Sequence, residues 1–516
     1  MKQRYEYDTE ALITQIWNYE PNIVFEIFDL IFIKCKSYSY KDFKKLKSRY
    51  IQLLPNFNKT QIGTTTFPYS PCCREIYELI LNDNITQINN ACFRSLSLLE
   101  KVTLSKDLRV IGSQAFYNCK RLPRIFIPSN VILISKYAFW RCKSLKSVYF
   151  NQKIKKIGER AFLGCHALKS VMLPKSVNKI SYEAFSECIN LEKVTLPESI
   201  TYLPDGLFNK CSKLVELNIP SSVNRLYDAV FANCVNLKCV NIPEDVSVIG
   251  SSLFENCKSL KDIKLPLKVW KICDRAFSGC LSMTEMSIPD KVIRMGNKAF
   301  SGCINLNKVN IPKNIIILNK GLFEKCEKLS QVSIPDSVTE ISKHCFHQCT
   351  NLTSLKMSTN VEIIGKFCFE NCINLGEISL GSKLQIIKMN AFNGCKSLNI
   401  KNLPDSLTLI ESGAFMGCES FTSVKIPEKV KILNINSFRG CINIRSVKVG
   451  KNVKTIANGA FTDCKNLQSV KIPYSVKKIS DSAFENCSQL KSCNLLNDGK
   501  VILSLLKAVS KIYKKK

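Results

Sequence analysis

Cysteine is the residue of this sequence whose type and spacing could do chemistry. The 516-residue chain holds 26 cysteines, and seventeen of them recur every 23 residues from Cys119 to Cys487. Such a row of thiols could bind metal ions or form disulfides. Each thiol, however, follows a phenylalanine by three residues, and this shared period is typical of packed side chains. Buried cysteine behaves as a small apolar residue, and thiols on neighbouring repeats would lie slightly too far apart for a relaxed disulfide. We therefore interpret the row as core.

Histidine offers the other candidate ligands. The stretch HCFHQC, residues 344–349, places two of the three histidines beside two cysteines. In the 23-residue register Phe346 and Cys349 belong to the core, which leaves the histidines at a surface turn and makes a zinc site the less favoured interpretation. The sequence also has no glycine-rich phosphate loop after a strand, no nucleophile elbow and no recurring carboxylate pair. We expect no metal, no cofactor and no enzymatic activity.

The cysteines form one column of a repeat that fills most of the chain. Phenylalanine recurs every 23 residues from Phe93 to Phe484, eighteen times without an insertion or deletion. The copy KAFSGCINLNKVNIP, residues 298–312, shows further apolar residues 6, 9 and 11 positions after the phenylalanine and a proline at position 12. A fixed period of this length indicates a repeat architecture, in which each coil buries its apolar face only against its neighbours.

Local patterns predict where the strand of each coil lies. Val309 and Ile311 alternate with Asn310, which is the period of a strand, and Pro312 ends the strand because it has no backbone donor. The stretch around AFxxC fits one short helical turn. One copy departs from the pattern, since Asn399-Ile400-Lys401 places lysine in the core slot. There we expect a bulge or a lysine that reaches out to solvent.

The recurring pattern LxxVxIPxSVxxIxxxAFxxC resembles the BspA-like leucine-rich repeat family, over roughly residues 70–495. The resemblance implies a right-handed solenoid that binds partners, and members on bacteria and parasitic protists are similar to surface adhesins. We therefore expect an α/β fold, a right-handed leucine-rich-repeat solenoid of about 18 coils of 23 residues. Its strands should form a concave parallel β-sheet.

The first and last copies of the repeat divide the chain into three segments. Residues 1–69 contain the helical patterns DTEALITQIW, NIVFEIFDLIFI and YKDFKKLKSRYIQLL and predict a small helical N-terminal cap, or else a partner-binding module. Residues 70–496 form the solenoid, which begins with a degenerate copy. Residues 497–516 predict a basic amphipathic helix, which either covers the last coil or touches anionic lipid.

The net charge and the N-terminal segment limit the classes of partner and the cellular location that we expect. Lysine and arginine total 74 and aspartate and glutamate total 42, a net charge of +32, which favours an anionic membrane, a nucleic acid or an acidic protein. A general lysine bias explains the total equally well. The N-terminus does not read as a secretory signal, and the most apolar stretch, residues 23–33, is too short and too charged to cross a bilayer. We expect a monomer that is cytoplasmic, or peripheral at the plasma membrane, with reduced thiols.

The residue ten positions after each phenylalanine should point away from the core. Near one end this slot holds apolar residues, the candidate partner-binding site: Phe126, Tyr149 and Met172. The alternative is that the N-terminal cap covers them. Near the other end lysines form two columns, the candidate anionic-surface site: Lys425, Lys448 and Lys471, with Lys431, Lys454 and Lys477.

We therefore expect a non-enzymatic, protein-binding and adhesion-like scaffold that uses its concave face. The alternative is a peripheral binder of an anionic membrane through its basic C-terminal third. Nucleic-acid binding is disfavoured because no aromatic residues interleave with the C-terminal lysines.

Overall fold

The computed structural model describes residues 31–35, 61–62, 76–81, 83, 85–400 and 402–495. It consists of two compact units, Met1–Val246 and Ser247–Lys516. Every regular element of the described residues is a β-strand, so the expected α/β class is not confirmed, and no helix of these residues could span a membrane. The expected C-terminal helix of residues 497–516 lies outside the described residues, as does most of the N-terminal cap.

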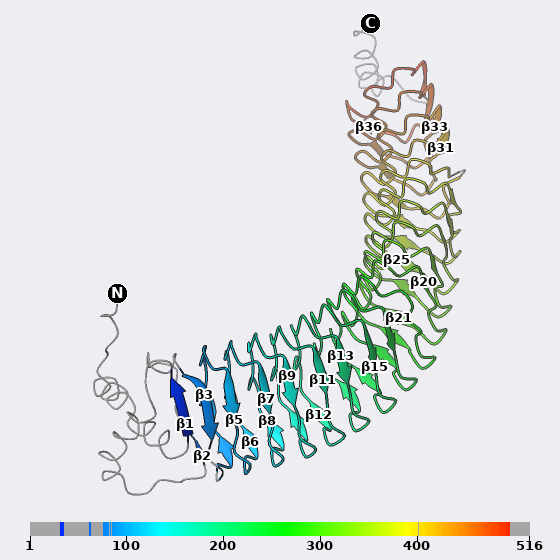
Figure 1. Ribbon diagram of the computed structural model, residues 1–516. Helices are drawn as coiled ribbons and strands as arrows, with labels where there is room; N and C mark the ends of the chain where they lie inside the picture. The colour runs from blue at the N-terminus through cyan, green and yellow to red at the C-terminus, as the bar shows by residue number, and fades with distance from the viewer. Residues whose placement is uncertain are drawn as a thin grey trace, which may run out of the picture. The chain divides into compact units, whose positions relative to one another are not determined.

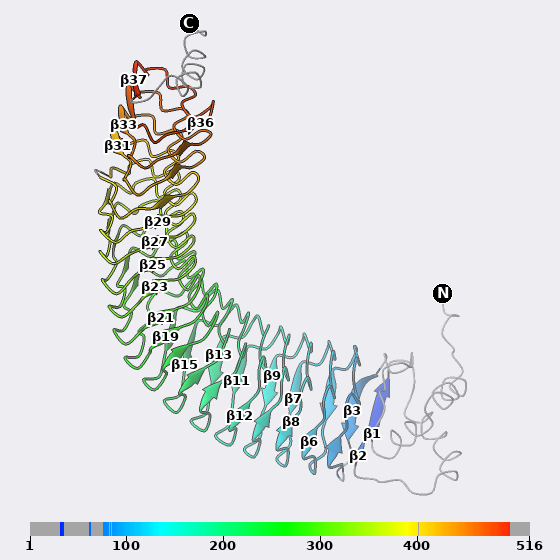
Figure 2. The same cartoon turned by 180° about the vertical axis from the view of Figure 1, so that it is seen from behind.

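Successive coils contribute strands to two rows in each unit (Figure 1, Figure 2). The strand of the first row contains the exposed slot ten residues after the phenylalanine or ends directly before it, and the strand of the second row follows the next turn. In the unit Met1–Val246 the first row comprises β3 (Ile76–Leu81), β5 (Lys101–Thr103), β7 (Arg124–Phe126), β9 (Ser147–Tyr149), β11 (Ser170–Met172), β13 (Lys193–Thr195), β15 (Glu216–Asn218) and β17 (Cys239–Asn241). The second row comprises β2 (Gln61–Ile62), β4 (Gln87–Ile88), β6 (Val110–Ile111), β8 (Leu133–Ile134), β10 (Lys156–Ile157), β12 (Lys179–Ile180), β14 (Tyr202–Leu203) and β16 (Arg225–Leu226).

The unit Ser247–Lys516 repeats this arrangement. Its first row comprises β20 (Glu285–Met286), β22 (Lys308–Val309), β24 (Gln331–Ser333), β26 (Ser354–Lys356), β28 (Glu377–Ile378), β31 (Ser423–Lys425), β33 (Ser446–Lys448), β35 (Ser469–Ile472) and β37 (Ser492–Leu495). Its second row comprises β18 (Val248–Ile249), β19 (Lys271–Ile272), β21 (Arg294–Met295), β23 (Ile317–Leu318), β25 (Glu340–Ile341), β27 (Ile363–Ile364), β29 (Ile386–Ile387), β30 (Leu409–Ile410), β32 (Ile432–Leu433), β34 (Thr455–Ile456) and β36 (Lys478–Ile479).

Paired strands within a row are parallel, as the sequence predicts. Phe126 pairs with Tyr149, and Lys425 pairs with Lys448, each at an offset of 23 residues. The same slot of successive coils is therefore brought side by side, so any property that recurs in one slot becomes a continuous column on the surface.

The AFxxC segment is not the helical turn that its pattern predicts. Its residues two before and two after the phenylalanine adopt left-handed backbone conformations, with φ of 56° at Lys298 and 74° at Gly302. The backbone N–H groups of Lys298, Phe300 and Gly302 donate to carbonyls of the next coil at 2.8, 3.0 and 2.7 Å. These donors are satisfied between coils rather than within a helix, and the segment therefore forms a third ladder along the stack.

Phenylalanine and cysteine fill the core between these ladders. The eighteen in-register phenylalanines are fully buried, and neighbouring rings stack, as in Phe277 and Phe300 with centroids 5.4 Å apart and planes 4° apart. Cys303 Sγ donates a hydrogen bond to the carbonyl of Phe277 at 3.2 Å. Burial raises the pKa of the Cys303 thiol to about 12, which leaves an inert thiol. The row of cysteines is core, and its members also satisfy carbonyls of the preceding coil.

At the N-terminal edge of the first row, a segment expected to be helical ends in a strand. The pattern of residues 22–33 predicts a helix, but its last three residues belong to β1 (Ile31–Cys35), which pairs antiparallel with β3. Isoleucine and phenylalanine favour strands, and the open edge of β3 offers them backbone partners. An edge strand that pairs in this way protects the end of the sheet.

The irregular copy interrupts the first row. Between β28 and β31 the described residues contain no first-row strand. Ile400 is only 6% exposed and occupies the core one position early, whereas Lys401 lies outside the described residues. The expected bulge or outward-reaching lysine therefore falls on a residue outside the described ones and stays a prediction.

Candidate functional site

The three apolar residues predicted to face solvent do so on β7, β9 and β11. Phe126 is 56%, Tyr149 50% and Met172 73% exposed. The rings of Phe126 and Tyr149 stack with centroids 4.4 Å apart and planes 6° apart. We call these three residues the strand-face patch. The expected N-terminal cap, which could cover the patch, lies in residues that are mostly outside the described ones.

The backbone fixes the orientation of the strand-face patch. Ile125 and Ile127 flank Phe126 and are 0% and 5% exposed, because alternate side chains of a strand point to opposite faces. Ile127 N–H donates to the carbonyl of Tyr149 at 2.9 Å, which holds the two coils in register. A stacked aromatic pair that faces water on a rigid strand is typical of a recognition surface.

The lysine columns form as predicted on the unit Ser247–Lys516. Lys425, Lys448 and Lys471 pair in register on β31, β33 and β35. The second column continues by backbone hydrogen bonds, from Lys454 to Lys431 at 2.8 Å and from Lys477 to Lys454 at 2.9 Å. All six side chains are exposed, and in the described part of the chain none of them forms an ion pair. We call these six residues the lysine columns.

The structure adds a second apolar strip that the sequence reasoning missed. Trp270, Ile293 and Ile316 occupy the slot sixteen residues after the phenylalanine, and they are 43%, 54% and 59% exposed. We call these three residues the second-row strip. Ile293 N–H donates to the carbonyl of Trp270 at 3.0 Å, so the two residues lie on adjacent coils. Apolar residues in the sixteenth slot of successive coils could have identified this strip in the sequence, just as those in the tenth slot identified the strand-face patch.

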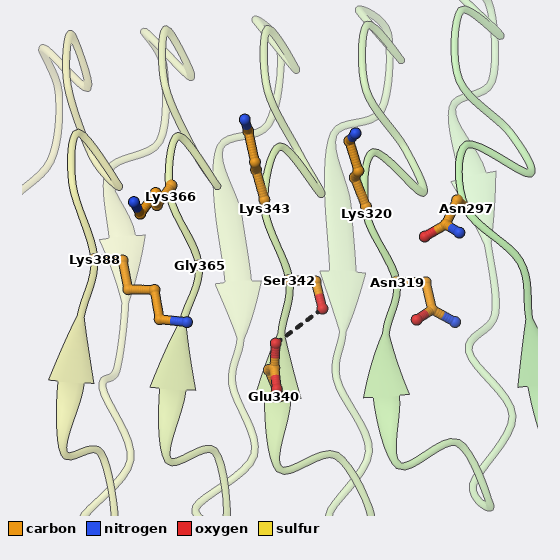
Figure 3. Close-up of a pocket in the computed structure, with 9 residues that line it drawn as sticks. All are labelled: Asn297, Asn319, Lys320, Glu340, Ser342, Lys343, Gly365, Lys366 and Lys388. Atoms are coloured by element: carbon orange, nitrogen blue, oxygen red, sulfur yellow. Dashed lines mark hydrogen bonds between the residues drawn. The ribbon is translucent and has the colours of Figure 1, made fainter.

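A basic pocket also lies on the unit Ser247–Lys516 (Figure 3). Four lysines and one glutamate, Glu340, are among its lining residues, and Glu340 accepts a hydrogen bond from Ser342 at 3.1 Å. The pocket is lined by Asn297, Asn319, Lys320, Glu340, Ser342, Lys343, Gly365, Lys366 and Lys388. Three of the lysines recur in one slot of successive coils, and this signal was present in the sequence. The pocket adds positive potential that attracts anions.

The HCFHQC stretch is divided between core and surface turn, as the register predicts. Cys345 and Cys349 are fully buried, so they are not available as ligands beside the histidines. His344 and His347 are half-buried on the turn.

A family model of the BspA type leucine-rich repeat region, comprising six copies, matches the chain over most of its length. The matched segments are residues 60–191, 133–261, 178–297, 270–399 and 385–505. The chain belongs to the BspA-type leucine-rich repeat family.

Solved structures of leucine-rich repeat proteins are similar to this BspA-type chain. A leucine-rich repeat protein from Bacteroides ovatus is 26% identical, with a TM-score of 0.55, and the match covers 82% of this chain and 96% of that chain. A leucine-rich cell surface protein from Faecalibacterium prausnitzii is 28% identical, with a TM-score of 0.40, and the match covers 73% of this chain and 88% of that chain. None of the curated proteins matches the chain.

Membership of the BspA-type family supports a binding role at a coarse level. Leucine-rich repeat solenoids are typically non-enzymatic scaffolds that bind protein partners over an extended surface. The strand-face patch, the lysine columns, the second-row strip and the basic pocket are each built from recurring slots of successive coils.

Proposed function

We propose that this BspA-type protein is a non-enzymatic, adhesion-like scaffold that binds a protein through its first-row strands, on the face that the sequence predicts to be concave. The observation that supports the proposal most is the strand-face patch. Aromatic and thioether side chains anchor many protein interfaces, because they bury a large area at low cost in side-chain entropy. Three of them stand together here on strands whose backbone is already fixed.

The surroundings of the patch define the chemistry of the partner. Arg124, Lys146 and Lys169 are exposed beside the strands of the patch. An apolar centre with basic neighbours fits a partner segment whose apolar residues are flanked by carboxylates. Such charge complementarity accelerates encounter, while the apolar centre supplies affinity.

Photo-crosslinking tests the face directly. A photoreactive phenylalanine analogue at Tyr149 should crosslink the partner, whereas the same analogue at Asn241, in the same slot of β17, should not. The triple variant Phe126→Ser, Tyr149→Ser and Met172→Ser should lose the partner and keep its thermal midpoint. The matched control Asn218→Ser and Asn241→Ser should keep both. Recovery of the same partner by the triple variant in affinity capture from the native cell would overturn the proposal.

The lysine columns favour a second candidate function, attachment to an anionic membrane. Six exposed lysines in register, without ion pairs among the described residues, present a regular array of positive charge. Each lysine near an anionic surface contributes about 1 kcal/mol at low salt. Such attachment would place the chain at the cytoplasmic face of the plasma membrane, which cell fractionation would test.

Liposome sedimentation separates the two candidates. Changing the six lysines to glutamine should abolish binding to phosphatidylserine vesicles and leave partner crosslinking at Tyr149 intact. The pocket lysines Lys320, Lys343 and Lys366, changed to glutamine, give a control of half that charge on another slot. A loss of binding free energy in the control that is half the loss in the six-lysine variant would show that net charge alone, rather than the columns, determines vesicle binding.

A further inference from the structure

Two histidines and a glutamate meet between adjacent coils of the unit Ser247–Lys516. One nitrogen each of His344 and His347 and one carboxylate oxygen of Glu324 lie within 4.8 Å of one another. Glu324 follows the phenylalanine of one coil directly, and His347 occupies the same slot of the next coil. The group therefore bridges two coils with three side chains that can bind metal.

Both histidines carry a buried nitrogen that lacks a hydrogen bond. The Nδ1 atoms of His344 and His347 are shielded from solvent and have no hydrogen-bond partner among the described residues. Glu370 Oε2 lies 3.2 Å from His347 Nδ1, close enough for an ion pair with a protonated ring but not aligned for a hydrogen bond. The Nδ1 of His344 is therefore the unpaired buried atom that requires an explanation, and a bound ion supplies one.

Packing holds the imidazole rings in place. The ring of His344 stacks on Phe367, with centroids 5.0 Å apart and planes 8° apart. The ring of His347 meets that of His344 edge to face, with centroids 5.1 Å apart. The backbone N–H of His344 donates to the backbone carbonyl of Lys366 at 3.0 Å. This hydrogen bond fixes the left-handed backbone conformation of His344. Stacking therefore keeps the two imidazoles beside each other before any ion binds.

The protonation states suit metal binding. Burial lowers the pKa of His344, and the neighbouring His347 and Lys343 lower it further, which favours the neutral imidazole that metals bind. Burial raises the pKa of Glu324, but the hydrogen bond from Lys298, with Nζ 2.9 Å from Oε2, outweighs this effect and the pKa is lowered overall. At neutral pH the group therefore offers a neutral imidazole at His344 and an ionised carboxylate at Glu324.

We propose that His344, His347 and Glu324 bind a divalent transition-metal ion and thereby join two coils. Zinc fits the set best, because two imidazoles and one carboxylate are common zinc ligands at about 2.0–2.2 Å. The three atoms must approach one another by roughly 1 Å to reach such distances, which side-chain rotation can supply. Glu370 acts as a positioning residue, which orients His347 from the far side as carboxylates do in zinc sites.

Lys298 gives the proposal a distinctive consequence. Its ammonium group pairs with Glu324 and stands beside the site, so it competes with the metal for the carboxylate and repels its charge. Lys298→Met should therefore bind zinc more tightly than the natural chain. A histidine pair without a metal role would show no such response.

Calorimetric titration of the full chain with Zn²⁺, and absorption spectra with Co²⁺, test the site. The variant His344→Asn with His347→Gln removes two of the three ligands and should lose more affinity than Glu370→Gln, which should lose about 10- to 100-fold. Asparagine is chosen at position 344 because it tolerates left-handed backbone. His166→Gln, on the third histidine of the chain, should bind as the natural protein does.

The outcomes decide the proposal in both directions. Nitrogen and oxygen ligation in the cobalt spectrum, loss in the double-histidine variant and tighter binding in Lys298→Met support the site. A thiolate-to-cobalt charge-transfer band, or equal affinity in the natural chain and the double variant, overturns it. Amide hydrogen exchange of residues 320–350 adds a readout of folding, since zinc should slow exchange there only when both histidines are present.

Discussion

The buried stack of phenylalanine rings, which we call the ladder, and the exposed first-row slot run along the same coils. The side chain is constant in the ladder and varies in the exposed slot. The ladder holds phenylalanine in every coil, because each ring must stack on the ring before and the ring after it. The exposed slot holds Phe126, Met172, Asn310 and Lys448 in different coils. The contrast teaches that the repeated residues determine stability, and that recognition is left to a slot whose side chain contacts mainly solvent and its neighbours in the column.

The same separation holds in the second exposed slot. Trp270, Ile293 and Ile316 occupy it earlier in the chain, and Lys431 and Lys454 occupy it later. Each exposed slot therefore holds apolar residues on one group of neighbouring coils and lysines on another. Since the ladder does not change between these coils, the difference arises from the surface alone.

Thiol reactivity should show the largest contrast between ladder and surface. The pKa of Cys303 is raised to about 12 by burial, so at pH 8 about one thiol in 10⁴ is ionised. Cys239 is exposed on β17. Peptide mass spectrometry after iodoacetamide treatment at pH 8 should find Cys239 modified at least about 10³-fold faster than Cys303. Denaturant should remove the contrast, and similar rates in the native protein would show that the ladder is open to solvent.

Truncation of a ladder ring should have the largest effect on stability. Phe300→Ala removes a fully buried ring and both of its stacking contacts, and such changes cost about 3–5 kcal/mol. Tyr149→Ala, which removes a ring of similar size from the exposed slot, should cost far less. Because a long repeat array need not unfold in one step, hydrogen exchange of peptides around residues 277–323 is the appropriate measurement. Equal costs for the two variants would abolish the distinction between ladder and slot.

The core and the columns could be predicted from the sequence because neighbours in space are separated by a constant 23 residues. From the sequence alone, this rule places Phe126 beside Tyr149 and Lys425 beside Lys448. The same rule places Glu324 beside His347 in the proposed metal-binding group, because the two residues are separated by 23 positions. That group is not evident in the linear stretch HCFHQC, which sets the histidines beside cysteines that face the core.

Local conformation was harder to predict than register. A short apolar run such as that of β1 has no period that separates helix from strand, and pairing with β3 determines its conformation. The AFxxC segment did carry a signal, since glycine or asparagine often stands two residues after the phenylalanine, as at Gly302 and Asn256. Both residues favour left-handed backbone, which a helical turn does not contain.

A substitution in that turn should have an intermediate effect. Gly440 has φ of 71°, and a Cβ there would lie 3.8 Å from Gly417 Cα, an ordinary contact. Gly440→Ala should therefore cost only the strain of left-handed backbone, about 1 kcal/mol, as measured by hydrogen exchange of peptides around residues 417–463. Gly440→Asn should cost less, because asparagine tolerates this conformation. A larger loss with asparagine than with alanine would indicate crowding rather than backbone strain.

The smallest effect on stability is expected in the exposed slot itself. Met172 is 73% exposed, so Met172→Ser should change the free energy of unfolding by no more than about 0.5 kcal/mol. The same change removes one third of the strand-face patch and should weaken crosslinking of a partner at Tyr149. Asn218→Ser, in the same slot of β15, should alter neither property. If Met172→Ser instead accelerated hydrogen exchange around residue 172 as much as Gly440→Ala does around residue 440, the exposed slot would contribute to the stability of the coil. The separation between ladder and surface would then not hold.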